Sequence, residues 1–334
     1  MSDEVIQEAI LEAERRGSAS DRDLGPEVAH YAQVLPELCA EWELTPLAWL
    51  PGGVNPPPIE VRTRSETSAV LKVQQPGLQD VAAAVLHAAA GDGYARMLRW
   101  DAGRGALLTE RLGESLWSVR KDLAGHARVI VPLLRRAWTV PLPVGRPFAS
   151  KAVGLREILA ELGPRYGGAA PEALARAVEY ADFLAASEQA EVVCHGDPHA
   201  DNVLRRGEGW ALIDPDGFVG ERAYDLGVVL RDACLEFAEE EGACPGGGVE
   251  MLRAGCRLLA ELSGVSPERV WRWGFVERVT TGLYLHWFGY LEQGSQFLDV
   301  AETIAQTTSG NMANQAGMSS AASTLTQGEP DDNR

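Results

Sequence analysis

The stretch of sequence that decides the fold is Cys194-His195-Gly196-Asp197-Pro198-His199-Ala200-Asp201-Asn202-Val203-Leu204, followed after a short turn by Trp210-Ala211-Leu212-Ile213-Asp214. Asp197 stands five positions before Asn202, and Asp214 closes the second apolar run. Transfer of a phosphoryl group from a nucleotide needs an aspartate that takes a hydroxyl proton and an Asn/Asp pair that holds magnesium on the phosphates. These three residues therefore indicate a phosphoryl-transfer site.

The chain around Asp197 predicts that this residue lies on a loop. Residues 192–194 are an apolar run, Val-Val-Cys, which is typical of a buried strand. Pro198 has no N–H group and cannot continue a strand ladder, so the strand must end before it. Val203 then resumes an apolar run, which places Asn202 at the far end of the loop.

A strand pair is predicted directly after this loop. Residues 207–209, Gly-Glu-Gly, form a turn, and the apolar run Trp210–Ile213 is the returning strand. Asn202 and Asp214 then lie at neighbouring strand ends and face one small volume. Because Mg²⁺ prefers oxygen ligands and takes only a few of them from protein, one amide oxygen and one carboxylate fit its demand.

Two other interpretations of the loop are open. His195, Asp197 and His199 alternate, so on an extended chain they would point the same way. Such a set could hold a catalytic transition metal, as in a metal-dependent hydrolase. The proline between them argues against an unbroken strand, and the Asn/Asp pair would have no task in a hydrolase. The other interpretation is a strand–loop–strand in which the polar residues only cap the strands.

The motif H-G-D-x-H-x-x-N-x-L, followed by I-D about ten residues on, resembles the signature of the aminoglycoside phosphotransferase family within the protein-kinase-like fold. Residues Gly220–Leu226 resemble the family's G-(D/E)-x-x-(F/Y)-D-(L/I), in which the aspartate, here Asp225, braces the catalytic loop. Trp42–Leu44, Ala69–Lys72 and Leu107–Leu112 are similar to the branch that contains streptomycin 6-phosphotransferase and hydroxyurea phosphotransferase. The resemblance covers roughly residues 35 to 300.

The resemblance implies an α+β, bilobal protein-kinase-like fold, with a small β-sheet N-lobe and a larger, mostly helical C-lobe. The sequence pattern agrees, because short strand signals dominate from residue 44 to residue 112 and helical patterns dominate after it. The predicted C-lobe helices run over about 118–138, 171–188, 222–240, 248–263 and 267–292.

Four segments are expected along the chain. They are an N-terminal helical extension over 1–43, the N-lobe with its nucleotide-binding sheet over 44–112, the C-lobe with the catalytic loop and substrate-binding helices over 113–305, and a tail over 306–334. The tail is rich in Ser, Thr, Gln and Asn, so it cannot bury enough apolar surface to become ordered, and we expect it to be disordered.

The resemblance also assigns roles to single residues. Asp197 is the catalytic base, and Asn202 and Asp214 hold Mg²⁺. Lys72 ends a predicted strand and corresponds to the lysine that pairs with the α- and β-phosphates, although the sequence alone equally allows a solvent-facing strand lysine. The acidic partner of this lysine should lie on the following helix, where Asp80 is the candidate.

The sequence signals for the rest of the nucleotide site are weaker. Gly52 and Gly53 lie between the first two predicted strands, where glycine N–H groups can cradle phosphate. Three prolines follow closely, so a plain turn is the alternative. Glu110 and Leu112 fall where the lobes would join, and the family makes backbone contacts to the base there. The implied cofactors are ATP or GTP, together with Mg²⁺.

Contacts to the acceptor substrate are expected in the late helices, which are acidic and aromatic. Asp232, Glu236 and Glu277 are the candidates, because carboxylates can hold ammonium or guanidinium groups. A net charge of −18, from 48 acidic and 30 basic residues, attracts a small cationic, hydroxylated substrate, although it equally suits simple solubility. The same charge repels phosphate backbones, so no nucleic-acid partner is expected.

The sequence carries no membrane or disulfide signature. Its five cysteines are scattered without a CxxC pair. No apolar run of 18 residues occurs, and no basic segment precedes an apolar stretch at the start. We expect a cytoplasmic enzyme without membrane contact, either a monomer or a homodimer.

Together these features predict an ATP-dependent O-phosphotransferase that modifies a hydroxyl of streptomycin or a related aminoglycoside and so gives antibiotic resistance. A kinase of another hydroxylated metabolite is the nearest alternative. The metal-dependent hydrolase and a nucleotide-binding pseudokinase are the alternatives from other classes. The sparse glycine loop and the lack of a glutamate on the helix after Lys72 keep the pseudokinase open.

Overall fold

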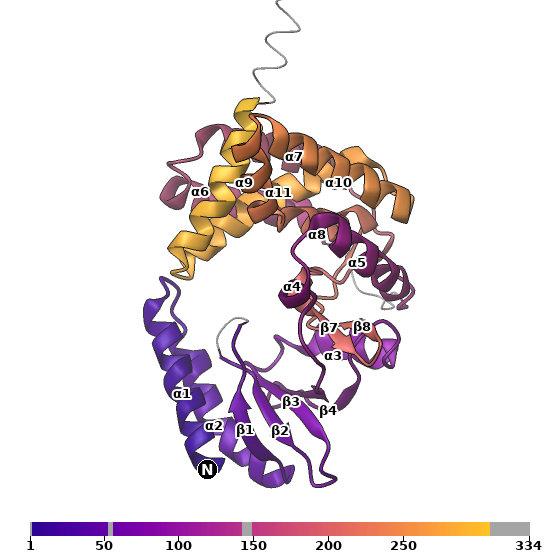
Figure 1. Cartoon of the computed structure of the whole chain (residues 1–334). Helices are drawn as coiled ribbons and strands as arrows, with labels where there is room; N and C mark the ends of the chain where they lie inside the picture. The colour runs from indigo at the N-terminus through magenta and orange to yellow at the C-terminus, as the bar shows by residue number, and fades with distance from the viewer. Residues whose placement is uncertain (1, 53–55, 142–148, 308–334) are drawn as a thin grey trace, which may run out of the picture.

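The computed structural model describes residues 2–52, 56–141 and 149–307 (Figure 1). The chain folds into two lobes, a small one built around a β-sheet and a larger one built mainly of helices, as the sequence predicted. Gly53 and the expected tail beyond residue 307 lie outside the described residues. Among the described helices, none combines the length and the apolar character that crossing a bilayer requires.

The N-lobe sheet has five antiparallel strands in the order β1-β2-β3-β5-β4. They are β1 (Thr45–Trp49), β2 (Ile59–Arg62), β3 (Ser68–Val73), β4 (Met97–Asp101) and β5 (Ala106–Glu110). Side chains of a strand alternate between its two faces. In β3 the residues Ala69, Leu71 and Val73 are buried, whereas Val70 and Lys72 on the other face are partly exposed.

An N-terminal helical hairpin covers the buried face of this sheet. It consists of α1 (Ser2–Ala19) and α2 (Gly25–Glu41). Tyr31, Leu35 and Leu38 of α2 share one buried cluster with Leu71 of β3. Because the hairpin occupies this face, Lys72 on the opposite face is left to the C-lobe.

The C-lobe is built around α11 (Pro267–Trp287), which packs against α6, α7, α8 and α10 (Figure 1). The other helices are α4 (Leu116–Val119), α5 (Leu123–Ala137), α6 (Lys151–Tyr166), α7 (Pro171–Ser187), α8 (Arg222–Arg231), α9 (Cys234–Ala243), α10 (Gly247–Ser263) and a last helix over 291–307. The small helix α3 (Asp80–Ala89) belongs to the N-lobe and follows β3.

Several helical predictions need correction. The helix expected over 118–138 is divided into α4 and α5, with residues 120–122 between them. The helix expected over 267–292 ends at Trp287, and a further helix over 291–307 that was not predicted follows it. The helix expected over 222–240 is two helices, because the chain leaves the helical path between Arg231 and Cys234. Helix α6 was not predicted, because Gly154, Gly163 and Pro164 weaken its helical pattern. Pro164 is nevertheless accommodated in its last turn.

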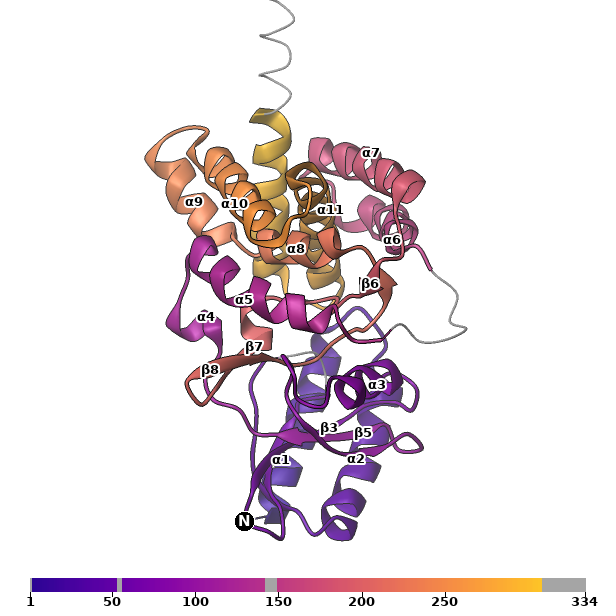
Figure 2. The same cartoon turned by 90° about the vertical axis from the view of Figure 1, so that its right-hand side faces the viewer.

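Two short strand pairs carry the decisive stretch of sequence. β6 (Val192–Val193) pairs with β9 (Val219–Gly220), and β7 (Val203–Arg206) pairs with β8 (Gly209–Leu212). A 3-10 helix, η1 (Ala200–Asn202), precedes β7. Figure 2 shows β7 and β8 between the lobes, below α4 and α5.

The strand register brings the predicted residues together. Val203 lies opposite Leu212, and the N–H of Ile213 donates to the carbonyl of Asn202 at 2.9 Å. Asn202 and Asp214 therefore lie at adjacent strand ends, as the sequence predicted.

The lobes meet first along the connection that follows β5. The N–H of Gly113 donates to the carbonyl of Arg205 at 2.8 Å, and the N–H of Arg205 donates to the carbonyl of Glu114 at 2.9 Å. This connection is thereby fastened to β7. The five-stranded sheet of the N-lobe is thus joined on this side to the strand pair that follows the Asp197 loop.

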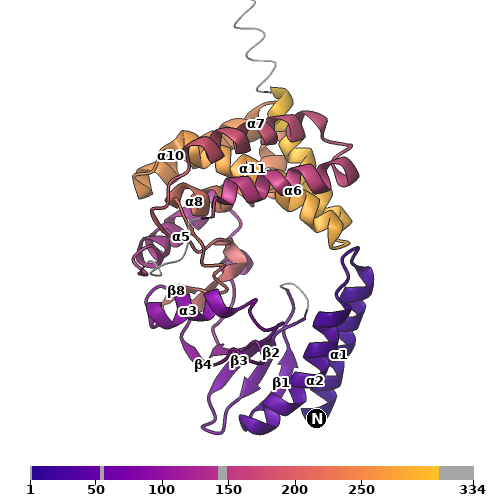
Figure 3. The ribbon, with the colours of Figure 1, turned by 180° about the vertical axis from the view of Figure 1, so that it is seen from behind.

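The lobes meet a second time at the turn between α1 and α2. The N–H of Asp21 donates to the carbonyl of Trp287 at 2.9 Å. The carboxylate of Asp21 accepts hydrogen bonds from Arg165 at 2.9 Å and from the hydroxyl of Tyr166 at 2.8 Å. Figures 1 and 3 show this contact on the side away from β7 and β8. We refer to these four residues as the N-terminal clasp.

Candidate active site

The loop that carries Asp197 is held by Asp225, a fully buried residue of α8. The Asp225 carboxylate accepts hydrogen bonds from the N–H groups of His195 at 3.0 Å and Gly196 at 2.9 Å, and from the indole of Trp138 at 2.8 Å. Burial raises the pKa of Asp225 to about 6, although these hydrogen bonds act in the opposite direction. Asp225 therefore braces the catalytic loop from the inside.

His195 is a second internal brace of the loop. Its Nε2–H group donates to the carbonyl of Ile213 at 2.8 Å, and its Nδ1 accepts from the N–H of Asp197 at 3.2 Å. The ring stacks on Tyr94 with 5.7 Å between centroids. Burial lowers the pKa of His195 to about 4, although the charge of Asp197 opposes this. Because both ring nitrogens are engaged, His195 cannot join His199 in a metal site, which contradicts the geometry of the hydrolase alternative.

The carboxylate of Asp197 lies between two cationic groups. Arg231 Nη2 is 3.0 Å from Oδ1, and His199 Nε2 is 3.4 Å from Oδ2. Burial alone would raise the pKa of Asp197, but the charges of His199 and Arg231 outweigh it and hold the pKa well below its usual range. Asp197 is therefore an anion with a side chain that is still 37% exposed.

Asn202 and Asp214 offer oxygen ligands suited to Mg²⁺. The Nδ2 group of Asn202 donates to the carbonyl of Asp197 at 2.9 Å. This fixes the orientation of the amide, and no donor among the described residues occupies its Oδ1. Asp214 has a φ of 56°, a conformation uncommon outside glycine and found at strained functional positions. One amide oxygen and one carboxylate thus lie at adjacent strand ends, and both are oxygen donors of the kind that Mg²⁺ prefers.

Lys72 reaches across from β3 to this pair. Its Nζ is 2.8 Å from Asp214 Oδ1. The predicted partner Asp80 is instead exposed at the first position of α3. The side of α3 that faces the catalytic loop presents Val81 and Val85, which approach Gly217 so closely that a Cβ there would lie within 2.8 Å of both. The structure therefore does not bring Asp80 to Lys72.

The joint between the lobes offers an apolar surface for a base. Leu112 shares a small buried cluster with Ala95 and Ala211, and the partly buried Leu204 and Ile213 pack against it. Within the described residues, the N–H of Leu112 has no protein acceptor. It is thus free of protein contacts among the described residues, and the predicted contact with a base stays a prediction.

Glu110 and Gly52 occupy their predicted positions on the N-lobe. The Glu110 side chain is engaged by Arg206 at 2.8 Å and by the N–H of Arg96 at 2.7 Å, so only its backbone is left for a base. Gly52 has a φ of 85° and is exposed at the turn after β1. Its carbonyl accepts a hydrogen bond from Arg16 of α1 at 3.2 Å.

Only one of the three predicted acceptor contacts is placed beside the catalytic loop. Asp232 lies 4.0 Å from His199 Nδ1. Glu236 instead accepts a hydrogen bond from the N–H of Leu123 at 2.7 Å and caps the start of α5. Its carboxylate is thus engaged in holding α5.

Glu277 is buried, contrary to its predicted contact with the substrate. Its carboxylate accepts from the Tyr224 hydroxyl at 2.5 Å and lies 3.4 Å from Arg231. Arg231 was not predicted as a site residue, because a single arginine at the end of a helix belongs to no recognisable motif. The only signal was its place six residues after Asp225 on the same helix.

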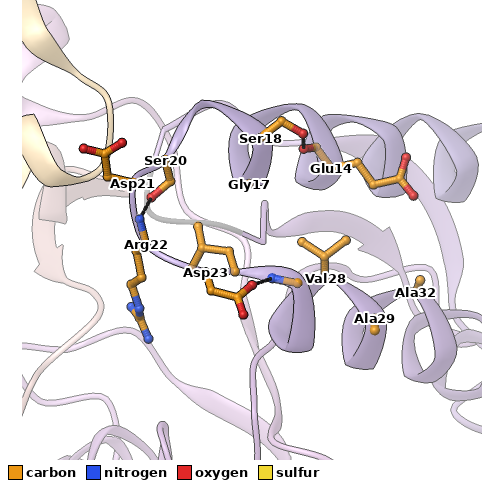
Figure 4. Close-up of a pocket in the computed structure, with 12 residues that line it drawn as sticks. Glu14, Gly17, Ser18, Ser20, Asp21, Arg22, Asp23, Val28, Ala29 and Ala32 are labelled. Carbon is orange, nitrogen blue, oxygen red and sulfur yellow. Dashed lines mark hydrogen bonds between the residues drawn. The ribbon is translucent and has the colours of Figure 1, made fainter.

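A cavity of about 650 Å³ lies elsewhere, at the turn between α1 and α2 (Figure 4). Its polar lining includes Glu14, Asp21 and Asp23. Asp23 accepts a hydrogen bond from the N–H of Gly25, and Ser20 from the N–H of Arg22, so the turn satisfies its own polar groups. None of the catalytic-loop residues lines this cavity.

The fold and the site together define the class of protein. A sheet lysine, an apolar joint between two lobes and an Asp-Asn-Asp set on a braced loop are the parts of a protein-kinase-like phosphotransferase that uses a hydroxyl acceptor. The model of the family described as aminoglycoside/hydroxyurea antibiotic resistance kinase matches residues 41–287. The chain belongs to this family.

Known relatives agree with this membership. The chain is 29% identical to a streptomycin 6-kinase of Streptomyces glaucescens, over 85% of this chain and 91% of that protein. It is 31% identical to a streptomycin 3''-kinase of Klebsiella pneumoniae, over 59% of this chain and 71% of that protein. Its fold is similar to that of the spectinomycin phosphotransferase APH(9)-Ia solved with ADP and spectinomycin, with a TM-score of 0.56, 14% identity and coverage of 81% and 96%.

Proposed function

We propose that this protein is an ATP-dependent phosphotransferase that phosphorylates a hydroxyl of streptomycin or a closely related aminoglycoside. The observation that carries the proposal is that four residues from two lobes are linked at one site through two contacts and one strand pair. Lys72 meets Asp214 at 2.8 Å, and Asn202 donates to the carbonyl of Asp197 at 2.9 Å. This arrangement has the acidic, amide and cationic groups that phosphoryl transfer uses.

Each residue has a separate task in the reaction. Asp197 orients the acceptor hydroxyl and takes its proton as the new P–O bond to the γ-phosphorus forms, while the bond from this phosphorus to the β-phosphate oxygen of ATP breaks and ADP leaves. Lys72 leaves its contact with Asp214 to bind the oxygens of the α- and β-phosphates. Because the transferred group needs little covalent help, positioning and charge stabilisation supply most of the acceleration.

Asn202 and Asp214 would hold the metal. Mg²⁺ would neutralise charge on the phosphates and bridge them to the protein. The bond from Asn202 Nδ2 to the carbonyl of Asp197 fixes the amide, so its oxygen would not need to reorient to bind the metal.

The base of the nucleotide is proposed to lie at the joint of the lobes. The free N–H of Leu112 and the backbone carbonyl of Glu110 supply the hydrogen bonds. Val70, on the same face of β3 as Lys72, would contact one face of the base from the N-lobe. Leu204 and Ile213 would contact its other face from the C-lobe.

The acceptor is proposed to be cationic for two reasons. The chain carries a net charge of −18, which favours association with a polycation. Two relatives that it resembles over much of its length are named streptomycin kinases. Among the three candidates, Asp232 is the carboxylate beside the catalytic loop; its Oδ1 is bonded to Arg231 at 2.7 Å, and its Oδ2 is the oxygen proposed to meet an ammonium or guanidinium group.

The test is a coupled assay of ATP consumption with Mg²⁺ and, in turn, streptomycin, other aminoglycosides, hydroxyurea and simple sugars. We expect turnover with streptomycin, and NMR of the product identifies the hydroxyl that receives phosphate. Nucleotide binding without transfer to any acceptor would identify a pseudokinase and overturn the proposal.

Asp197→Asn provides the matching variant. It keeps the size of the side chain but removes the proton acceptor, so we expect kcat to fall roughly 10²- to 10⁴-fold while nucleotide affinity changes little. Asp201→Asn on the same loop is the control. The Asp201 carboxylate binds the hydroxyl of Ser115 at 2.8 Å and does not touch Asp197, so its kcat should stay within about twofold of wild type, well short of the usual worth of a general base.

A further inference from the structure

A buried guanidinium lies directly behind the catalytic aspartate. Arg231 is the last residue of α8, and its side chain is 10% exposed. Its Nη2 donates to Asp197 Oδ1 at 3.0 Å. We propose that Arg231 is a positioning residue that anchors one oxygen of Asp197 and so fixes the direction in which the carboxylate faces the acceptor hydroxyl. This inference rests on the proposed phosphotransferase function.

The contact is directional because it involves a single oxygen. The other oxygen, Oδ2, is 3.4 Å from His199 Nε2, and the Asp197 side chain remains 37% exposed. A carboxylate on a loop has free rotation about its terminal bond unless something restrains it. The Arg231 contact supplies that restraint from the buried side and leaves the exposed side for the substrate.

Arg231 can act as a fixed point because it is itself held on several sides. Its Nε donates to Asp232 Oδ1 at 2.7 Å, and its Nη1 donates to Thr281 Oγ1 at 3.3 Å. Its carbonyl accepts from Arg278 Nε at 3.2 Å. The guanidinium is planar and permanently charged, so these bonds fix both its position and its orientation.

A buried cation needs compensating charge, and Glu277 supplies part of it. The Glu277 carboxylate is 3.4 Å from Arg231 Nη1, and the hydroxyl of Tyr224 donates to its other oxygen at 2.5 Å. An unpaired charge at this depth would be strongly unfavourable. Glu277 therefore acts on the catalytic aspartate through Arg231, which explains why an acidic residue lies on the buried side of α11.

A purely structural role would be that Arg231 only ties α8 to α11. The two roles differ in what they do to turnover. A tie between helices affects stability, whereas an anchor for Asp197 affects kcat and leaves nucleotide binding intact, since Lys72, Asn202 and Asp214 do not touch the guanidinium in the described contacts.

The test compares Arg231→Gln and Arg231→Lys with wild type in steady-state kinetics. We expect Arg231→Gln to lower kcat about 10²-fold, the usual effect of a misplacement of about 1 Å, with the KM for ATP within about threefold. Arg231→Lys keeps a positive charge at this position but lacks the planar guanidinium with its forked donors. We therefore expect its kcat to lie between the values of Arg231→Gln and wild type. A wild-type kcat in Arg231→Gln would overturn the inference.

Arg269→Gln is the matched control. Arg269 also forms an ion pair with a buried glutamate of the C-lobe, Glu221, but its contacts do not include the catalytic loop. This variant should lower the unfolding temperature while kcat stays within about twofold, since no misplacement of the reacting groups is involved. An equal loss of kcat in both variants would show a structural role and overturn the inference.

Crystal structures of Arg231→Gln and wild type make the inference testable without an acceptor. We expect the Asp197 carboxylate to rotate away from its wild-type orientation in the variant. An unchanged orientation would overturn the inference. Absence of turnover in the wild type would instead overturn the proposed function, and the comparison of structures would still decide the role of Arg231.

Discussion

The carboxylate of Asp225 lies 2.9 Å from the backbone nitrogen of Gly196, and its second oxygen is 3.0 Å from the nitrogen of His195. Two consecutive N–H groups of the catalytic loop thus share one carboxylate. These two groups belong to the residues directly before Asp197. Asp225, a residue of the C-lobe, therefore fixes the backbone that leads to Asp197. Asp225 is entirely buried, which makes this restraint independent of solvent.

Asp225→Asn should destabilise the protein by about 1–3 kcal/mol, because its amide group would direct its own N–H towards a backbone donor or the Trp138 indole. Urea unfolding measures the change. The control is Asp182→Asn, which removes an exposed ion pair with Arg156 and should change stability by no more than about 0.5 kcal/mol. Equal stability of Asp225→Asn and wild type would contradict the proposed bracing.

Protonation of His195 should make the stability of the protein pH-dependent. Burial lowers the pKa of this residue from 6.5 to about 4 in the folded state. The unfolded chain therefore binds a proton below about pH 6.5 that the folded chain does not accept, so stability falls as the pH decreases towards 4. The contribution lost between pH 7 and pH 5 is about 2 kcal/mol.

His195→Gln isolates this contribution, because other titrating groups are common to both proteins. The variant is expected to be less stable than wild type at pH 7, since it loses the stacking on Tyr94. The difference in unfolding free energy should narrow as the pH is lowered to 5. A difference that stays constant over this range would show that His195 does not titrate as its burial requires.

Lys72→Met should weaken nucleotide binding without altering the fold. A hydrogen bond between charged groups contributes about 1.5–3 kcal/mol, so the Kd for ATP should rise roughly 10- to 100-fold. Isothermal calorimetry measures this change. Lys121→Met is the control, because Lys121 lies on the surface, 4.0 Å above the ring of Trp117. If both variants bound ATP like wild type, Lys72 would have no part in the site.

The sequence was sufficient for the parts of the site that are close along the chain. Asp197, Asn202 and Asp214 are placed by a loop and one strand pair, so apolar runs and a turn determine their relative positions. The two lobes were also predictable, because strand patterns are concentrated between residues 44 and 112 and helical patterns dominate the longer segment that follows. Helix α6 was missed, since glycine and proline in its interior weaken a helical pattern that tertiary packing nevertheless stabilises.

Residues that reach the site through tertiary contacts were harder to predict. Glu277 is acidic and was expected at the substrate, yet its partners Arg231 and Tyr224 lie more than 40 positions away and enclose it. Asp80 was expected beside Lys72 because it starts the next helix. The orientation of α3, which directs Val81 towards Gly217, decides otherwise. A local sequence pattern specifies neither how a helix is oriented against its neighbours nor which residues distant in the sequence contact one another.

The N-terminal clasp changes the mechanics of the two lobes. A protein whose lobes are joined by one connection can bend about it in several directions. Here the lobes are held on one side by the connection after β5 and by the backbone hydrogen bonds of Gly93 and Ala95 with Leu212, and on the opposite side by the contact of Asp21 with Trp287. Two bodies held on two opposite sides retain one easy rotation, about the line that joins these sides. Any opening of the site would follow that single axis, and Gly52 would move with α1 through the hydrogen bond that Arg16 donates to its carbonyl.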